Sequence, residues 1–314
     1  MSPKSTAVLT ALALLALAPA GRAQGSGPYQ WVETGRHFAR LQDAVSAIGD
    51  GTGTILFPDG AYRDCAVQTA GAITYRAATP GKAILQQAIC EGKAALVLRG
   101  RDAKVEGLVF QGLAVADGNG AGIRLEHGDL AIDQAWFRDS EEGILSADDP
   151  DHAVTIDRST FTHLGRCDRG LSCAHSVYIG QYGRVTVRRS RFEAGRGGHY
   201  LKSRAARIDV TDSSFDDSAG RTTNYMIDLS NGATGRIAGN WFVQGPDKEN
   251  HSAFITVAPE GKLHPSDGLA IHDNDARFAP GVTWPSTFVA DWSGDRLNIG
   301  ANALPSRLKV RDSR

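Results

Sequence analysis

The sequence lacks the features that mark several common protein classes. Its 314 residues carry a net charge of only −1, so nothing indicates a nucleic-acid partner, whose phosphates call for a strong basic excess. Beyond the N-terminus, no apolar run is long enough to cross a bilayer as a helix. Aromatic residues make up 7% of the chain against 36 glycines, a composition that favours a turn-rich β protein.

The four cysteines include no CxxC pair, so a metal site built from them is the weaker interpretation. Their spacing favours two disulfides, Cys65 with Cys90 between neighbouring coils and Cys167 with Cys173 around a loop. Disulfides form in oxidising compartments, and the N-terminus has the signature of export. Lys4 precedes an apolar run at 7–17, and small residues suited to cleavage follow at 18–20 or 21–23. We therefore expect a secretory signal peptide at 1–23 and a secreted or periplasmic location.

A short amphipathic helix is expected over 36–48, because Phe38, Leu41, Val45 and Ile48 fall on one helical face. A glycine-rich stretch ends this helix, and residues 54–63 predict a strand and a turn. Such a helix would cover the open end of a sheet-built core, which a repeat protein needs in order to stay soluble.

An internal repeat runs through the rest of the chain. A short apolar-x-apolar strand is followed three residues later by a small or polar residue and, two positions further on, by phenylalanine. The strands lie at 103–105, 130–132, 154–156, 185–187, 208–210, 236–237 and 269–271. The phenylalanines are Phe110, Phe137, Phe161, Phe192, Phe215 and Phe242, and the last copy ends in Ala276. The repeat length is about 25 residues, which excludes several other repeat architectures.

Such a unit is too short for a propeller blade, and it lacks both the helices of ankyrin-type repeats and the leucine consensus of a horseshoe. It fits a parallel β-helix in which the phenylalanines stack at a corner. We predict an all-β fold: a single-stranded right-handed parallel β-helix of about ten coils, with a short N-terminal capping helix, as one domain over 24–314. With coils about 4.8 Å apart, the rod is about 45 Å long.

The segments 38–45 and 53–62 resemble the N-terminal cap and first coil of the pectate-lyase-like right-handed parallel β-helix superfamily. The coils that carry Phe161, Phe192 and Phe242 are similar to its repeats. The likeness covers nearly the whole mature chain and implies the fold. It implies no single activity, because this architecture hosts lyases, hydrolases, epimerases and non-catalytic proteins.

Three successive coils contain strands with alternating side chains, at 175–180, 199–204 and 225–230. In register, Tyr178, Lys202 and Asp228 point outward, and we call these three residues the column. The flanking residues are Ser176, Tyr200 and Met226 on one side and Gly180, Arg204 and Ser230 on the other. An insertion at 162–174 is expected to form one wall of a cleft beside the column, and further insertions lie at 148–151 and 246–250.

A groove lined by cations and aromatic rings suits an acidic sugar chain. The candidates for its lining are Arg124, Tyr178, Tyr200, Lys202 and Arg204, with Glu126, His175 and Ser176 as further binding residues. Elimination from a uronate needs a cation to neutralise the carboxylate, a base for the C5 proton and an acid for the leaving oxygen. The sequence therefore indicates a lyase of a uronate-containing glycan.

Two divisions of roles are open. Lys202 beside Arg204 could be the base, since adjacent positive charge lowers a lysine pKa. Asp228 could instead pair with Lys202 and keep it protonated, and then Tyr178, Tyr200 or His199 is the better base.

Residues 200–204 are similar, over one strand, to the lysine-bearing strand of β-helical alginate lyases and chondroitinase B. The resemblance implies a lysine base, an arginine and often calcium. In those enzymes the arginine comes from a following coil and carboxylates bind the metal, whereas the corresponding coil here offers Asp228. Calcium is left open as a cofactor, and no metal ligand is assigned.

Structural explanations compete with these roles. Lys202 and Asp228 also fit a plain cross-coil ion pair, and His175 and His199 fit stacked structural histidines. The acidic residues at 148–151 are more typical of a solvated turn than of a metal site. The polar residues at equivalent corner positions predict a hydrogen-bonding ladder: Ser159, Ser190, Ser213 and Asn240. They are not expected to be nucleophiles, because no histidine–aspartate partners accompany them at the proper positions.

We thus expect an exported carbohydrate-active protein, foremost a polysaccharide lyase that acts by β-elimination on an acidic polysaccharide or oligosaccharide. One alternative is a glycoside hydrolase of the same fold, which needs two carboxylates that only Asp228 and the 148–151 cluster offer. The other is a non-enzymatic glycan-binding or scaffold protein.

Overall fold

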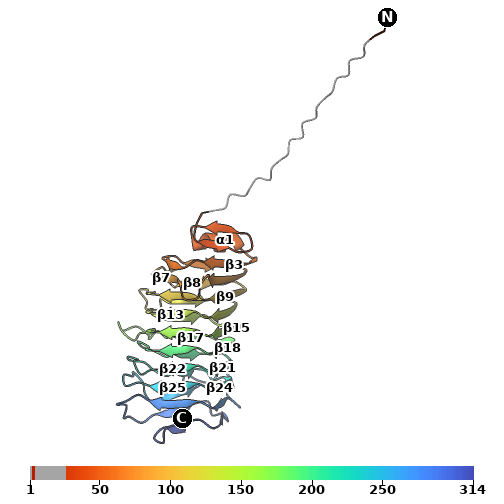
Figure 1. Cartoon of the computed structure of the whole chain (residues 1–314). Coiled ribbons are helices and arrows are strands. Elements are labelled where there is room, and N and C mark those ends of the chain that lie inside the picture. The colour runs from red at the N-terminus through yellow and green to blue at the C-terminus, as the bar shows by residue number, and fades with distance from the viewer. Residues whose placement is uncertain (1, 4–25) are drawn as a thin grey trace.

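The computed structural model describes residues 2–3 and 26–314, and its strands wind into a parallel β-solenoid of about nine turns (Figure 1). The predicted signal peptide at 1–23 lies, apart from two residues, outside the described residues. Three sheets run along the solenoid, each made from one strand of every coil. The predicted β-helix is therefore confirmed.

The first sheet carries the apolar-x-apolar strands. Its order is β2 (Arg36–Phe38), β1 (Tyr29–Trp31), β3 (Thr52–Phe57), β6 (Ala72–Ala77), β9 (Asp102–Glu106), β12 (Asp129–Asp133), β15 (Asp149–Asp157), β18 (Tyr182–Arg188), β21 (Arg207–Thr211), β24 (Thr234–Ala238), β27 (Ala270–His272) and β30 (Asn298–Ile299). The pairs from β3 onward are parallel, whereas β1 pairs antiparallel with both β2 and β3.

The second sheet carries the phenylalanines. Its order is β28 (Asp275–Phe278), β25 (Trp241–Gln244), β22 (Ser214–Asp216), β19 (Arg191–Glu193), β16 (Thr160–Thr162), β13 (Trp136–Arg138), β10 (Leu108–Gln111), β7 (Ala83–Gln86) and β4 (Gly60–Tyr62).

The third sheet carries the column. Its order is β31 (Lys309–Ser313), β29 (Thr287–Asp291), β26 (Ala253–Val257), β23 (Ile227–Leu229), β20 (Leu201–Ser203), β17 (Val177–Ile179), β14 (Glu142–Ser146), β11 (Ala121–Leu125), β8 (Ala94–Leu98) and β5 (Ala66–Gln68).

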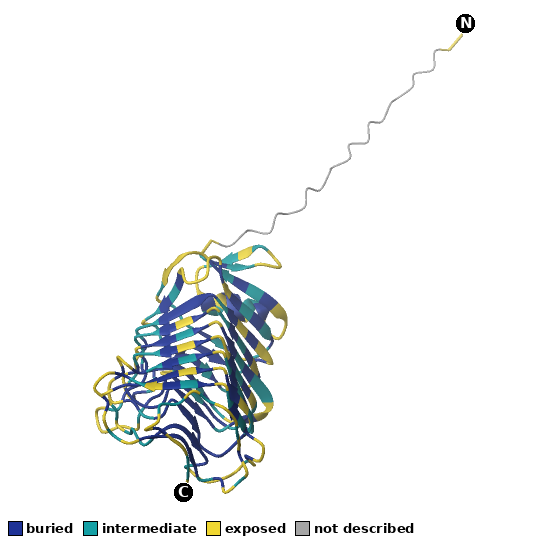
Figure 2. Ribbon diagram, turned by 60° about the horizontal axis from the view of Figure 1, so that its bottom comes forward, coloured by how far each residue is buried: buried dark blue, intermediate teal, exposed yellow. Residues whose placement is uncertain are grey.

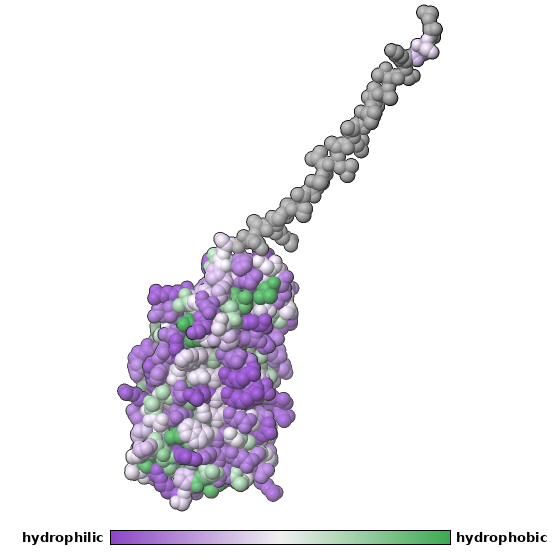
Figure 3. Space-filling model, viewed as in Figure 1, coloured by the Kyte–Doolittle hydropathy of each residue, from purple (hydrophilic) through white to green (hydrophobic). Residues whose placement is uncertain are grey.

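The core follows from the repeat. Successive phenylalanine rings from Phe110 to Phe242 stack nearly parallel with centroids 4.7 to 5.1 Å apart, and each ring is buried. Because strand side chains alternate, buried and exposed positions form stripes along the solenoid (Figure 2). The face seen in Figure 3 is mostly hydrophilic, with apolar side chains scattered over it.

A side-chain ladder holds the corner between the first and second sheets. The backbone N–H groups of Ser159, Ser190 and Ser213 each donate to the side-chain oxygen of the equivalent residue on the next coil, at 3.0 or 3.1 Å. The ladder continues through Asn240 to Asn274. These side chains satisfy buried backbone donors, so the predicted structural role is confirmed.

The capping helix begins later than predicted. Helix α1 spans Leu41–Ile48, whereas residues 36–38 form β2 and pair with β1. Arg40 is extended, and the carboxylate of Asp64 accepts the backbone N–H of Leu41 at 2.7 Å, which fixes the start of the helix. Helix α1 lies over the N-terminal end of the solenoid, where its buried face closes the core (Figure 1).

Both predicted disulfides are present, Cys65–Cys90 and Cys167–Cys173. Among the residues that the structure describes, no helix has the length and apolarity to span a membrane.

Candidate functional site

The column lies on the third sheet in the predicted register. Tyr178 pairs with Lys202, and Lys202 pairs with Asp228. Arg124 occupies the same row two coils before Tyr178, with Leu145 between them. The side chains of Lys202 and Asp228 are only 7% and 2% exposed, so these two column residues are buried, whereas Tyr178 is partly exposed.

Glu260, in the turn after β26, covers the column. Its carboxylate binds both the Lys202 ammonium and the Arg204 guanidinium, while its own side chain stays 42% exposed. Arg204 Nε donates to Tyr178 Oη at 2.8 Å, and its Nη1 donates to Asn231 Oδ1 at 2.6 Å. Two cations therefore converge on one carboxylate, and the phenol of Tyr178 is hydrogen-bonded to one of them.

The local charges decide the protonation of Lys202. Burial by itself lowers the pKa of Lys202, but the negative charges of Asp228 and Glu260 outweigh burial, so this pKa lies above its ordinary value. Burial likewise raises the pKa of Glu260, but hydrogen bonds from Lys202 and Arg204 reverse that effect and hold it below the usual range. Of the two divisions of roles, the one in which Arg204 depresses the pKa of Lys202 is wrong, because Asp228 and Glu260 both bind the Lys202 ammonium.

Asp228 has no free oxygen. Thr256 Oγ1 donates to Oδ1 at 2.8 Å, and Oδ2 accepts from Ser230 Oγ at 2.8 Å and Lys202 Nζ at 3.1 Å. Calcium needs several carboxylate or carbonyl oxygens free to coordinate it. Because the carboxylates of Asp228 and Glu260 are both taken by cations and hydroxyls, this site does not fit calcium.

A second ladder flanks the column. Glu142, His175 and His199 occupy equivalent positions, and each accepts the backbone N–H of the next coil through Oε1 or Nδ1, at 3.0 to 3.2 Å. The two imidazoles stack with centroids 4.9 Å apart. Since Nδ1 accepts a hydrogen bond, each neutral ring carries its proton on Nε2. His199 Nε2 lies 3.6 Å from Asp228 Oδ2, so this nitrogen faces an acceptor.

Both histidines are neutral in the folded protein. Burial and the positive charge of Lys202 lower the pKa of His199 to about 3. Burial and the neighbouring ring of His199 lower the pKa of His175 well below its ordinary value. With the proton on Nε2, His199 is poorly placed to accept another one at neutral pH.

Two predicted groove residues lie elsewhere. Tyr200 is 1% exposed and packs in the core, where its hydroxyl donates to Asp217 Oδ1 at 2.7 Å. Burial and the charge of Asp217 raise its pKa well above the usual range. Ser176 is also buried. Both precede their strands at a turn into the core, where the outward alternation of the strand no longer applies.

Arg124 and Glu126 remain partly exposed. Glu126 binds Lys93 at 2.7 Å and Arg99 at 2.5 Å, and it lies 3.6 Å from Arg124. Arg124 Nε is buried without a hydrogen-bond partner. The sequence brings Arg124 to the correct row, two coils from Tyr178, or about 10 Å along the solenoid.

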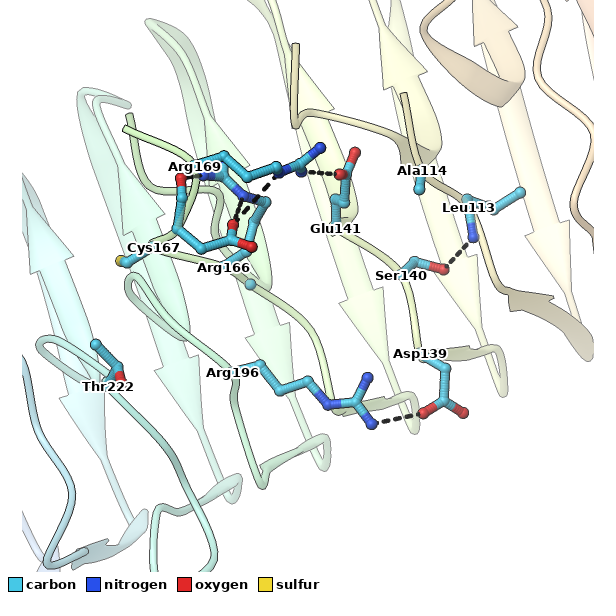
Figure 4. A pocket seen from close by; sticks show the side chains of 12 residues that line it. Leu113, Ala114, Asp139, Ser140, Glu141, Arg166, Cys167, Arg169, Arg196 and Thr222 are labelled. Carbon is cyan, nitrogen blue, oxygen red and sulfur yellow. Dashed lines mark hydrogen bonds and ion pairs between the residues drawn. The ribbon is translucent and has the colours of Figure 1, made fainter. Parts of the chain in front are cut away.

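The disulfide insertion lines a cavity of about 400 Å³, but on the side of the turns that precede the third sheet (Figure 4). Its charged lining residues pair among themselves: Arg169 with Glu141, Arg166 with Asp168, and Arg196 with Asp139. No column residue lines this cavity. The insertion thus forms the wall of a hollow beside the column strands, without opening onto the column itself.

Sequence reasoning missed Glu260 and Asn231. Glu260 lies 58 residues from Lys202 and outside any strand, so the repeat assigns it no register. The one available signal was the length of chain between β26 and β27, which carries Glu260 in a turn.

Comparisons with solved structures found neighbours of low sequence identity. The solved structure of the PL6 family alginate lyase AlyGC matches with a TM-score of 0.55 and 14% identity, over 84% of this chain and 38% of that chain. Geobacillus virus E2 ORF18 matches with a TM-score of 0.47 and 17% identity, over 87% of this chain and 57% of that chain. This chain therefore spans less than two thirds of either one.

No protein-family model matches the sequence, and no curated protein matches it significantly. The solved structure with a TM-score of 0.55 shares the parallel β-solenoid, so the likeness supports the fold that the sequence predicted.

Proposed function

We propose that the protein is a polysaccharide lyase that cleaves a uronate-containing glycan by β-elimination at the column. The observation that carries the proposal is the binding of the Glu260 carboxylate by both Lys202 and Arg204, with Tyr178 hydrogen-bonded to Arg204. An internal carboxylate occupies the position that a uronate carboxylate would take. The similar solved structure that is named an alginate lyase supports an acidic glycan as the substrate.

In the proposed reaction, each residue of the site has a separate role. Lys202 and Arg204 bind the uronate carboxylate, which neutralises its charge and acidifies the proton on C5. Tyr178, reacting as the phenolate, accepts that proton, and Arg204 Nε, which donates to Tyr178 Oη, stabilises the negative charge on the phenolate. The electron pair of the C5–H bond forms the C4–C5 double bond, and the bond from C4 to the glycosidic oxygen breaks. That oxygen leaves with a proton returned by Tyr178.

Asp228 has a supporting role. Its charge keeps Lys202 protonated, and its hydrogen bonds to Ser230 and Thr256 fix it in place. A cationic Lys202 neutralises the substrate and does not act as the base, which leaves that role to Tyr178. His199 and Tyr200 are less suitable, because His199 carries its proton toward Asp228 and Tyr200 lies in the core.

Substrate binding in this proposal requires Glu260 to move. Glu260 lies in a turn and is 42% exposed, whereas Lys202 and Asp228 are held by strands. A uronate carboxylate exchanges with Glu260 at the two cations, so the ion pairs that hold Lys202 and Arg204 in the resting protein are replaced and not lost. Glu260 therefore competes with the substrate.

We also propose that the protein is exported, since the proposed substrate is an extracellular polymer. Two disulfides support an extracellular or periplasmic location. The features at 1–23 that indicate a signal peptide support it from the sequence.

The test is a screen of acidic polysaccharides with the wild type, Arg204→Ala and the control Lys104→Ala. Lys104 is an exposed lysine on the first sheet whose ion pair with Glu106 lies away from the column. Ultraviolet absorbance detects the unsaturated uronate, a reducing-end assay detects any cleavage, and affinity electrophoresis detects binding. We expect absorbance with at least one polyuronate, its loss in Arg204→Ala and its retention in Lys104→Ala.

Two other outcomes point to other functions. Reducing ends without ultraviolet absorbance indicate hydrolysis, although Asp228 has no free oxygen for that reaction. Binding without either product indicates a glycan-binding platform, a role that the full pairing of Lys202 in the resting protein favours. Either result contradicts the lyase proposal.

A further inference from the structure

A separate cluster of two histidines and one aspartate lies between two neighbouring coils. His127 Nδ1 lies 2.8 Å from Asp149 Oδ2, and His152 Nδ1 lies 2.8 Å from Asp149 Oδ1. One carboxylate thus holds two imidazoles, one on each oxygen. The ring centroids are 4.8 Å apart in an edge-to-face arrangement. One donor atom from each of the three residues lies within 4.8 Å of the other two.

The backbone builds this cluster. His127 lies in the turn between β11 and β12, and Asp149 begins β15 on the next coil. Strand β15 has a bulge between Asp149 and Ala153, which turns His152 back toward Asp149. The acidic insertion at 148–151, which the sequence pattern assigned to a solvated turn, supplies this bulge.

Gly128 fixes the carboxylate. Its backbone N–H donates to Asp149 Oδ2 at 2.9 Å. Its φ is +88°, and a Cβ there would lie 2.1 Å from the carbonyl oxygen of Gly100, so no other residue fits. Asp149 is therefore held by the backbone in a buried position, while the two histidines reach it from the more exposed side.

The charge around the cluster favours a cation. Asp129 and Asp151 lie close enough to His152 to act on it electrostatically. The ion pairs of Asp149 in the structure are with the two histidines. When both imidazoles are neutral, the cluster and its neighbours carry net negative charge with two ring nitrogens available as donors.

We propose that His127, Asp149 and His152 bind a divalent transition metal ion. Two imidazoles and one carboxylate form a donor set that suits zinc and leaves coordination positions open to solvent. The side chains of His127 and His152 are 55% and 26% exposed, so an ion can enter without unfolding. The ion takes the place of the protons now shared with Asp149 and cross-links the turn at 126–128 to the bulge at 150–152.

The cluster differs from an exposed histidine–aspartate pair elsewhere in the described chain. His272 Nδ1 lies 2.8 Å from Asp273 Oδ2, the same separation as in the cluster, but within residues 2–3 and 26–314 no third histidine, cysteine or carboxylate lies close enough to complete a metal site with them. His272→Ala is therefore a matched control that removes one histidine–aspartate pair without touching the cluster.

The test uses the untagged full chain, stripped with a chelator and dialysed. Zinc chloride is added, unbound ion is removed by gel filtration, and bound zinc is measured by elemental analysis for the wild type, His127→Ala/His152→Ala and His272→Ala. A second titration with cobalt records its visible absorption, which reports nitrogen and oxygen coordination. The melting temperature of each stripped protein checks folding independently.

We expect one zinc ion per chain in the wild type and His272→Ala, none in the double variant, and a rise in melting temperature on zinc addition only where zinc binds. The stripped double variant should melt below the stripped wild type, since the buried Asp149 carboxylate loses both imidazole partners, and a cooperative melting transition shows that it still folds. Failure of the wild type to retain zinc, or equal zinc retention by the double variant, overturns the proposal.

Discussion

Replacement of Asp228 by asparagine tests the buried ion pair at the centre of the column. Asparagine has the same shape and keeps one oxygen acceptor, so the change removes the charge and turns the other acceptor into an amide donor. Lys202, 7% exposed, then loses the partner that lies 3.1 Å away. Removal of one member of a buried pair costs about 3–5 kcal/mol, and because Glu260 still binds Lys202, we expect about 3 kcal/mol.

The assay is urea unfolding followed by circular dichroism, with comparison of m values to check that the transition is unchanged in extent. The control is Asp209→Asn, which removes a carboxylate from an exposed ion pair with Arg236 and should cost less than about 1 kcal/mol. For a chain of this size, the Asp228→Asn loss corresponds to a melting temperature lower by about 5 °C.

A double-mutant cycle isolates the pair. Lys202→Met in the Asp228→Asn background removes the stranded charge, so the double variant should be more stable than the sum of the single changes predicts, by about 1–3 kcal/mol. Additive single effects, or an Asp228→Asn variant within about 0.5 kcal/mol of the wild type, would refute the buried-pair reasoning.

Three further predictions follow from the same contacts. Glu260→Gln removes the carboxylate that competes with substrate for Lys202 and Arg204. In initial-rate assays the KM for a polyuronate should fall several-fold while kcat changes little, and a raised KM contradicts this role. The pKa of His199 is lowered to about 3 from an ordinary value near 6.5, so between these pH values the unfolded chain binds a proton that the folded protein does not. The neutral buried ring therefore makes its full contribution to stability above about pH 6.5, and the free energy of unfolding falls by about 1.4 kcal/mol per pH unit as pH drops toward 3. His199→Asn, which keeps an acceptor for the Tyr225 N–H, should flatten the fall of stability in urea titrations between these pH values, whereas the exposed His272→Asn should not. Removal of the Cys65–Cys90 disulfide, with a sequence separation of 25, should lower the free energy of unfolding by about 3.5 kcal/mol, and removal of Cys167–Cys173, with a separation of 6, by about 2.2 kcal/mol. If urea unfolding gives the reverse order, chain entropy is not the cause of the stabilisation.

The fold was predictable because each coil repeats the same local pattern. The spacing from an apolar-x-apolar strand to its phenylalanine fixes the register between coils, and the stacked rings from Phe110 to Phe242 follow it. The same register placed Tyr178, Lys202 and Asp228 in one row. Alternation within a strand is a local property, which a sequence carries directly.

The parts that sequence did not predict lie outside the strands. Glu260 reaches the column from a turn, and its position depends on how that turn folds back over the sheet. Tyr200 directly precedes a strand, where the chain turns into the core, so strand alternation gave the wrong face. Residues 36–38 have a helical apolar pattern, but pairing with β1 outweighs it.

The bulge at 150–152 illustrates the same limit. The sequence shows that the coil has extra residues there, but only the structure shows that they return His152 to the carboxylate that also holds His127. Insertions interrupt the repeat, and their geometry depends on contacts with the coil before them.

The central claim is that Tyr178 takes the C5 proton of a uronate held by Lys202 and Arg204. Turnover of a polyuronate by Tyr178→Phe, followed by ultraviolet absorbance with binding measured alongside, tests it most directly. Tyr225→Phe is the control, since its hydroxyl bonds Asn250 at 2.7 Å and lies off the column. We predict that kcat of Tyr178→Phe falls by about 10²–10⁴-fold while binding is retained. Turnover by Tyr178→Phe at the wild-type rate would contradict the claim.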